Sequence, residues 1–195
     1  MKRELFEYGG YYHVYNRGNN GENLFHEERN YLYFLNLMKK YLHPIAEIYA
    51  YCLMKNHFHI ILKIKEREEL KNVLEERLHL PFSNFFNSYA KAINKAYGRT
   101  GSLFQEHLKR NRISSNESLV QAVSFVHLNP EFHKVCPDFA SYKHSSYKAY
   151  LCLQHTMLTR QYIITLFGGI DNFKYEHDLK KINFELIQEI LFLEQ

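Results

Sequence analysis

Residues 50–62 read AYCLMKNHFHIIL, and this stretch decides the fold. It joins two runs rich in β-branched, aromatic and aliphatic residues, which extend beyond it on both sides and predict strands over residues 45–54 and 57–64. Only Lys55 and Asn56 separate the two runs, and a link of two residues is typical of a β-hairpin. The stretch therefore predicts an antiparallel hairpin near the middle of the chain.

Strand and helix patterns alternate on either side of this hairpin. Residues 11–17 alternate polar and aromatic side chains, which predicts a strand, and residues 103–113 are expected to be extended or a loop. Apolar spacing, caps and breakers predict helices over residues 27–42, 66–78, 81–97, 119–128 and 178–194, with short helices within 145–151 and 158–169. This order predicts an α+β fold with one antiparallel sheet flanked by helices.

The composition is that of an ordinary globular protein, with 46% hydrophobic and 24% charged residues. Its 16 Tyr and 15 Phe predict stacked rings in the core, although some rings could instead stack on bases. A formal net charge of +4 permits nucleic acid as a partner without establishing it. Three scattered Cys, no signal peptide and no long apolar run predict a cytoplasmic protein with reduced thiols.

The sharpest local feature is the triplet His57-Phe58-His59. On a strand, residues i and i+2 point to the same face, so both imidazoles should face outward together while Phe58 points into the core. Two neutral imidazoles at this spacing can share one divalent ion. The alternative interpretation is a pair of strand histidines without a ligand.

Asn129 is the candidate for a third metal ligand. It lies one helical turn after residue 125, so the two positions share a helix face. If that face packs over the sheet, the side-chain oxygen of Asn129 could bind a hard cation. The alternative is that Asn129-Pro130 merely ends the helix, as an X-Pro pair often does.

Six segments together resemble a known family. They are HVYNRGNNGENLF at 13–25, AYCLMKNHFHIIL at 50–62, GSLFQEHLKRNRI at 101–113, FVHLNP at 125–130, KHSSYKAYL at 143–151 and the weaker FGGIDNFKYEH at 167–177. In this order and spacing the chain resembles the REP-associated tyrosine transposases, which are single-tyrosine members of the His-hydrophobe-His (HUH) superfamily. The resemblance covers nearly the whole chain.

The resemblance implies a ferredoxin-like antiparallel sheet with a catalytic domain over residues 1–155 and a helical C-terminal extension over 156–195. It implies that His57, His59 and Asn129 bind magnesium or manganese, which would polarise a scissile phosphate. The implied partner is single-stranded DNA with hairpin-forming repeats, bound by a monomer or a homodimer. In the family, a tyrosine one turn before the asparagine forms a 5′-phosphotyrosine and leaves a 3′-hydroxyl.

The corresponding position in this sequence is Phe125, which has no hydroxyl and cannot be the nucleophile. Deliberate replacement of a tyrosine is the favoured explanation, because deleting one hydroxyl is nearly isosteric and the other segments are intact. A naturally inactivated DNA-binding protein is the second explanation. The third is a different nucleophile, with Tyr142 and Tyr147 as candidates. An ordinary core aromatic at position 125 is compatible with all three.

Several polar residues are candidates for contacts with DNA or for support of the metal. Lys109, Arg110 and Arg112 form the densest basic run and could bind phosphates, or could simply be solvated surface. The remaining candidates for DNA contacts are Arg17, Asn19 and Asn56, the last of which could instead be a turn residue. Gln105 and Glu106 could support the metal ligands or form local pairs. A metal-dependent hydrolase with Glu106 as base is a weaker alternative.

Overall fold

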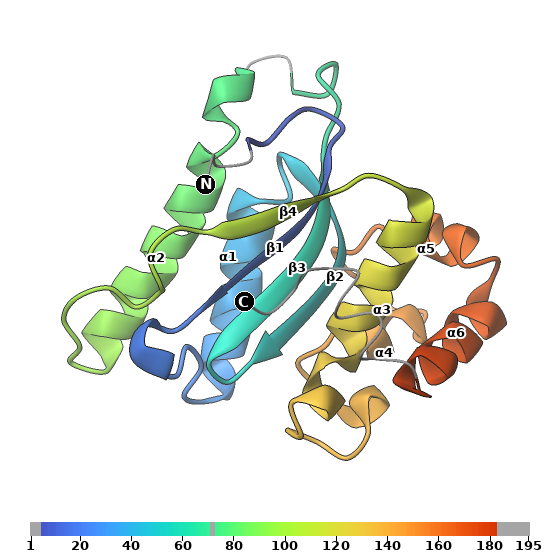
Figure 1. The fold of residues 1–195 in the computed structure, drawn as a ribbon. Helices are drawn as coiled ribbons and strands as arrows, with labels where there is room; N and C mark the ends of the chain where they lie inside the picture. The colour runs from blue at the N-terminus through green and yellow to red at the C-terminus, as the bar shows by residue number, and fades with distance from the viewer. Residues whose placement is uncertain (1–4, 71–72, 183–195) are drawn as a thin grey trace.

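A computed structural model describes residues 5–70 and 73–182 (Figure 1). Four strands form one antiparallel sheet in the order β2-β3-β1-β4. The strands are β1 (Tyr11–Arg17), β2 (Ala46–Met54), β3 (His57–Ile64) and β4 (Lys109–Ile113). Helix α1 (Glu28–Tyr41) connects β1 to β2, and α2 (Leu80–Ala96) connects β3 to β4. This β-α-β-β-α-β order is the ferredoxin-like one, so the predicted α+β fold is confirmed.

The central hairpin has nearly the boundaries that the sequence predicts. Strands β2 and β3 pair across the link Lys55-Asn56, with Met54 opposite His57. The ladder is interrupted once, at Tyr49, where β2 contains an extra residue and forms a β-bulge. Because side chains alternate along β3, the hairpin fixes which of its residues enter which layer of the protein.

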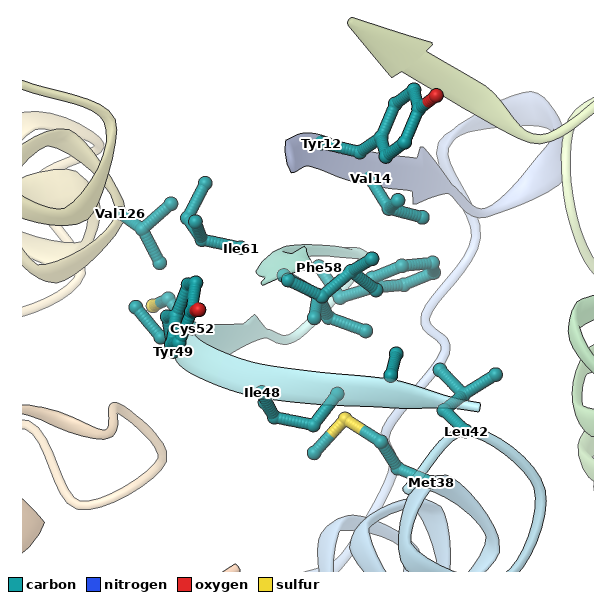
Figure 2. Packing of buried hydrophobic residues seen from close by; sticks show 14 of the residues in the cluster. Tyr12, Val14, Met38, Leu42, Ile48, Tyr49, Cys52, Phe58, Ile61 and Val126 are labelled. Atoms are coloured by element: carbon teal, nitrogen blue, oxygen red, sulfur yellow. The ribbon is translucent and has the colours of Figure 1, made fainter. Parts of the chain in front are cut away.

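Helices α1 and α2 cover one face of the sheet, and Phe58 lies at the centre of that layer. Its ring is fully buried, with its centroid 5.2 Å from that of Phe34 and 5.3 Å from that of Phe86. Figure 2 shows Phe58 on one side of the hairpin and Ile61 on the other, toward Val126. Burial of a phenylalanine side chain contributes about 1.5–3 kcal/mol, so this layer fixes the position of β3.

Helix α3 (Asn116–Phe132) covers the other face of the sheet (Figure 1). The Ser115 side chain caps it by accepting a hydrogen bond from the Ser118 backbone at 3.1 Å. Residues 122–130 are all buried, because strands lie on one side of the helix and C-terminal helices on the other. Neither α3 nor any other helix in the described ranges is long and apolar enough to cross a membrane.

The prediction that Asn129-Pro130 ends this helix is wrong. Helix α3 continues through Pro130 to Phe132. Proline removes one helical hydrogen bond, but its fixed φ is compatible with a helix, and the burial of Pro130 in the last turn offsets the loss. Asn129 is therefore helical and lies one turn from Phe125 on the same face of α3.

The 3-10 helix η3 (Phe139–Ser141) and three α-helices complete the described part of the chain: α4 (Tyr147–Tyr150), α5 (Arg160–Leu166) and α6 (Ile170–Ile182). The segments before α4 and α5 cover the outer edge of β2 through three backbone hydrogen bonds, one of which runs from the Ser146 N–H to the Tyr51 carbonyl at 2.9 Å. His144 accepts from Leu53 at 3.0 Å, and Ile48 accepts from Thr159 at 2.9 Å. Covering an edge strand in this way prevents unwanted pairing with other strands. The division of the chain after residue 155 stays a prediction.

Two predicted helices differ from those observed. The helix expected over residues 66–78 is wrong: the described part contains turns and the short 3-10 helix η2 (Glu75–Arg77). Leu70 and Leu78 are the buried leucines there, which is too few for an apolar helical stripe. The last helix, expected over 178–194, begins earlier, at Ile170, and residues 183–194 lie outside the described residues.

A buried polar chain ties α3 to α6. The Nδ1 atom of His127 lies 2.9 Å from Nε2 of His177, and its Nε2 lies 2.8 Å from Oγ of Ser146. His177 must donate from Nδ1, at 2.7 Å, because its partner there is the carbonyl of Phe173. For two neutral rings, this direction requires His127 to donate from Nδ1 to His177 and to accept from the Ser146 hydroxyl at Nε2. Burial, followed by the neighbouring His177, lowers the pKa of His127 well below its usual value.

Acid should therefore destabilise the fold through His127. The unfolded chain protonates this histidine first, so its contribution is intact above about pH 6.5 and is lost as the pH falls below that value. Between pH 6 and 5, His127 should lower the unfolding free energy of the parent protein by up to about 1.4 kcal/mol per pH unit. We expect His127→Gln to remove this contribution. Urea unfolding at several pH values measures this.

The exposed residue His155 provides the matched control. The variant His155→Gln should follow the pH dependence of the parent protein. If His127→Gln also keeps the parent dependence, the assignment of acid sensitivity to His127 is wrong.

Candidate metal centre and nucleic-acid interface

His57 and His59 project from β3 toward helix α3. Their ring centroids are 5.3 Å apart and the rings are nearly perpendicular. The sequence correctly places Phe58 in the core, but the opposite face is not open as expected, because α3 covers it. His59 is only 3% exposed, and His57 is half-buried. The pair therefore lies at the interface between the sheet and α3, with His57 at its margin.

Helix α3 presents Phe125, Asn129 and His133 at successive four-residue spacings above these rings. Phe125 is fully buried and packs against His59 in a T-shaped arrangement, with 5.7 Å between ring centroids. Asn129 is also fully buried, whereas His133, just after the helix, is exposed. The centroid of His133 lies 4.9 Å from that of His57. One face of α3 and the residue after it thus lie over His59 and His57. This contact is buried at Phe125 and exposed to solvent at His133.

Unsatisfied polar atoms are buried at this interface. Among the described residues, Nε2 of His59 and both side-chain polar atoms of Asn129 are buried and lack a hydrogen-bond partner. Leaving such a group unsatisfied costs about 1–3 kcal/mol, and most buried polar groups in native proteins are paired. Imidazole nitrogens and amide oxygens both bind divalent ions, so the donor set fits a metal ion.

A metal centre at this interface would depend on the amide of Asn129 as its third ligand. In the described ranges, no group of three or more His, Cys, Asp or Glu side chains is arranged to hold a metal ion. Two histidines and one asparagine fall outside that set because asparagine is not one of these four residue types. Such ligands would carry no formal charge, which would leave the charge of a bound cation available to a phosphate.

Asn56 orients the first histidine of the pair. Its Oδ1 lies 2.8 Å from Nδ1 of His57. Because an amide oxygen can only accept, Nδ1 carries the hydrogen, and the neutral ring keeps its lone pair on Nε2. The turn of the central hairpin therefore sets His57 in a tautomer that suits a metal ligand. A contact of Asn56 with DNA stays a prediction.

Burial keeps the second histidine neutral. It lowers the pKa of His59 well below the usual value, and the neighbouring rings of His13, His57 and His133 lower it further. Burial also lowers the pKa of His13 to about 3. Metal ions bind the neutral form of imidazole, so the protonation state required for binding is already present at neutral pH.

Two residues of β1 belong to this layer and were not predicted. Nε2 of His13 lies 2.9 Å from Nδ1 of His59, and Tyr15 lies opposite His59 in the β1–β3 register. The ring centroids of Tyr15 and His59 are 5.8 Å apart. Strand alternation alone could have placed both residues on one face, but the pairing of β1 with β3 and its register are not encoded in a local pattern.

The two tyrosines considered as substitute nucleophiles are engaged elsewhere. The Tyr142 hydroxyl donates to the Leu53 carbonyl at 2.8 Å. Tyr147 is buried on the far side of α3, where its ring packs against Phe139 and Phe173. The structure therefore brings neither hydroxyl into contact with the two histidines.

The basic run of β4 is divided between the two faces of the sheet. The Lys109 ammonium lies 5.9 Å from the ring centroid of Tyr15, on the histidine face. Arg110 instead covers Phe6 at 4.4 Å, and Arg112 forms an ion pair with Glu7. Strand alternation explains this division, and it leaves Lys109 as the member of the run on the histidine face.

Arg17 and Asn19 lie at the end of β1, close to the histidine pair in register. Arg17 is exposed and pairs with His57 across β1 and β3. Asn19 begins the 3-10 helix η1 (Asn19–Gly21), and its backbone N–H donates to Leu103 at 2.9 Å. A side chain does not fit at Gly18, since a Cβ there would lie 1.9 Å from the Glu22 carbonyl oxygen.

Gln105 and Glu106 lie away from the candidate metal ligands. Both line a groove of about 1090 Å³ between α2 and the loop before β4. The Gln105 carbonyl accepts a hydrogen bond from the Asn16 side chain at 3.3 Å, and Glu106 lies 3.5 Å from His107. In the described part of the chain, no hydrogen bond or ion pair joins them to the candidate ligands. The side chains hydrogen-bonded to the Nδ1 atoms of His57 and His59 are instead those of Asn56 and His13.

Comparison with known proteins supports the fold. No protein-family model matches the sequence, and no curated protein matches it. Among solved structures, the chain is similar to a REP-associated tyrosine transposase bound to a REP hairpin, with a TM-score of 0.58. The match has 16% sequence identity and covers 80% of this chain and 88% of that chain. At this identity the likeness shows a common fold and does not by itself place the chain in that family.

Replacing the unsatisfied amide of Asn129 should stabilise the metal-free protein. We expect Asn129→Leu, a change of similar shape, to raise the unfolding free energy by about 1–3 kcal/mol in the presence of a chelator. The same variant should lose any stabilisation that MnCl₂ confers on the parent protein. Urea unfolding with EDTA and with MnCl₂ measures both effects.

Asn30 is the matched control, because it is also a buried helical asparagine but its Oδ1 accepts from the His26 and Glu27 backbones. Asn30→Leu should therefore destabilise the protein under both conditions. Equal destabilisation by the two substitutions would show that Asn129 is satisfied in solution and is not held ready for a metal.

Proposed function

We propose that this protein binds hairpin-forming single-stranded DNA and holds a magnesium or manganese ion between His57, His59 and Asn129. The observation that carries the proposal is the set of buried, unsatisfied ligand atoms on His59 and Asn129. The fold shared with a transposase bound to a DNA hairpin supports a DNA partner. The net charge of +4 is compatible with such a partner.

Each residue of the site has a separate role in this proposal. His57 and His59 each offer a neutral ring nitrogen, and Asn129 offers its side-chain oxygen. When bound, the metal ion supplies Lewis-acid polarisation of a phosphate group. Helix α3 holds position 125 one turn from Asn129, so a nucleophile at that position would lie beside the metal ligands.

Phe125 prevents this chain from attacking DNA from that position. With a tyrosine there, the phenol oxygen would bond to phosphorus while the bond from phosphorus to the 3′ oxygen breaks. The phenol proton would leave to a base or to water, and the departing 3′ oxygen would take up a proton to become a hydroxyl. The chain thus combines the site of a strand transferase with an aromatic ring that cannot perform the first step.

Access to this site is limited by α3 itself. Phe125 and Asn129 are fully buried, so a DNA phosphate reaches them only if α3 moves from the sheet. Half-buried His57 and exposed His133 mark the open margin, where DNA would approach. The same burial favours a second candidate function, a hairpin-binding protein without catalysis.

Restoring the missing hydroxyl tests the first candidate. We expect Phe125→Tyr, with Mn²⁺ or Mg²⁺ and a labelled hairpin oligonucleotide, to form a covalent protein–DNA adduct with 5′ attachment and to release a 3′-hydroxyl end. Denaturing gel electrophoresis and mass spectrometry detect both products. The unsubstituted protein should form no adduct.

The double variant Phe125→Tyr with His59→Ala is the control for metal dependence. It should bind the hairpin and form no adduct. If Phe125→Tyr binds the hairpin with metal and still forms no adduct, position 125 is not the nucleophile position. Hairpin binding that survives His57→Ala and His59→Ala would then support the non-catalytic candidate.

The division of the basic run predicts unequal effects of its members on DNA binding. Lys109→Ala should weaken hairpin binding about threefold to tenfold and lower the slope of log affinity against log salt by about 1, because one phosphate contact is lost. Arg112→Ala should change affinity less than about twofold, since Arg112 pairs with Glu7 on the other face. Fluorescence anisotropy at several salt concentrations compares them. The reverse ranking would contradict DNA binding on the histidine face.

A further inference from the structure

We infer that His13 is a positioning residue for the metal centre. His13 accepts a hydrogen bond from Nδ1 of His59, and this leaves Nε2 of His59 available as a ligand. The inference rests on the proposed function, since it assumes that His59 binds a metal ion. It adds a residue from β1, outside the histidine triplet.

The geometry of the two rings carries the inference. Nε2 of His13 and Nδ1 of His59 are 2.9 Å apart, a normal hydrogen-bond distance. The rings are almost parallel, at 16°, with centroids 5.1 Å apart. His13 is 2% exposed, and the Phe125 ring packs against both rings in T-shaped arrangements, with centroid distances of 6.2 Å to His13 and 5.7 Å to His59. Strand pairing and α3 therefore hold the two imidazoles in one relative position.

The direction of this hydrogen bond decides whether His59 can bind a metal. A neutral imidazole carries one hydrogen, on either Nδ1 or Nε2. If Nδ1 of His59 donates to His13, then Nε2 of His59 has a free lone pair. If His13 donates instead, Nε2 of His59 carries the hydrogen and repels a cation. A cation at Nε2 therefore requires His13 to be the acceptor.

The buried atoms around the pair agree with this dependence. Among the described residues, Nε2 of His59 and Nδ1 of His13 are both buried without a hydrogen-bond partner. One of these atoms must carry a hydrogen and the other a lone pair in either arrangement. A metal ion can satisfy the lone pair of His59, whereas it cannot satisfy an N–H there. The ion thus favours the arrangement in which His13 accepts.

The other histidine of the pair is supported in the same way from a different element. The Oδ1 atom of Asn56, in the hairpin turn, accepts from Nδ1 of His57 at 2.8 Å. Metal-binding histidines almost always donate their second N–H to such a partner, and loss of the partner typically weakens metal binding about 10–100-fold. His13 would be the corresponding partner for His59, with the difference that its acceptor is a neutral imidazole.

Two substitutions of nearly equal volume separate this role from packing. His13→Gln keeps an acceptor, because its amide oxygen reaches about as far from the backbone as Nε2, and His13→Met does not. We expect His13→Met to weaken Mn²⁺ binding about 10–100-fold and His13→Gln to stay within about threefold of the parent protein. Electron paramagnetic resonance of free Mn²⁺ measures the affinities of the full chain.

A second measurement reports the tautomer of His59 directly. Long-range ¹H–¹⁵N NMR spectra with Mg²⁺ present should show the hydrogen on Nδ1 in the parent protein and in His13→Gln. The Nε2–H form should increase in His13→Met. If His13→Met does not fold, His13→Asn replaces it in both measurements. The asparagine side chain is too short for its amide oxygen to reach Nδ1 of His59.

The outcomes separate this inference from the proposed function. If the parent protein binds Mn²⁺ and His13→Met binds it equally well, His13 has no positioning role and the metal centre stands. Equal weakening by Gln and Met would show that His13 acts through packing, which also overturns the inference. If the parent protein binds no Mn²⁺ at millimolar concentration, the metal centre fails and the inference fails with it.

Discussion

The docking of helix α3 across the second face of the sheet is the constraint on which the rest of the structure depends. It buries His59 of β3 and Asn129 of α3 between the helix and the sheet, where neither side chain can form hydrogen bonds with water. The opposite side of the same helix is fixed by the neutral chain from His127 to His177. Apolar contacts around Phe125 and Val126 therefore stabilise an interface that contains unsatisfied ligand atoms, and a metal ion is the group that would satisfy them.

Local sequence patterns were enough for the parts of the fold that follow from periodicity. Alternation in the stretch around Phe58 predicted the hairpin and the shared face of the two histidines, and helical spacing predicted α1 and α2. Local patterns failed where tertiary packing overrides a local signal. Helix α3 continues through Pro130, where it was expected to end, because the burial of this proline offsets one lost hydrogen bond. The charged segment over residues 66–78 has too few apolar positions to hold a helix on the sheet.

The candidate site was predictable only in part, because it is assembled from three elements distant in sequence. His57, His59 and Asn129 were identified, and the structure brings the face of α3 that carries Asn129 onto their strand. His13 was missed, since the register that places it beside His59 is a property of the assembled sheet. The basic run of β4 is continuous in sequence, but strand alternation places Arg110 and Arg112 on the other face.

The central claim is that His57, His59 and Asn129 together bind one divalent ion under α3. Anomalous X-ray diffraction from crystals of the unsubstituted protein grown with MnCl₂ tests it most directly, because manganese is located without assuming its ligands. The account predicts an anomalous peak bonded to Nε2 of His57, Nε2 of His59 and Oδ1 of Asn129. An absence of manganese at this position in manganese-saturated crystals, with α3 still docked on the sheet, would contradict it.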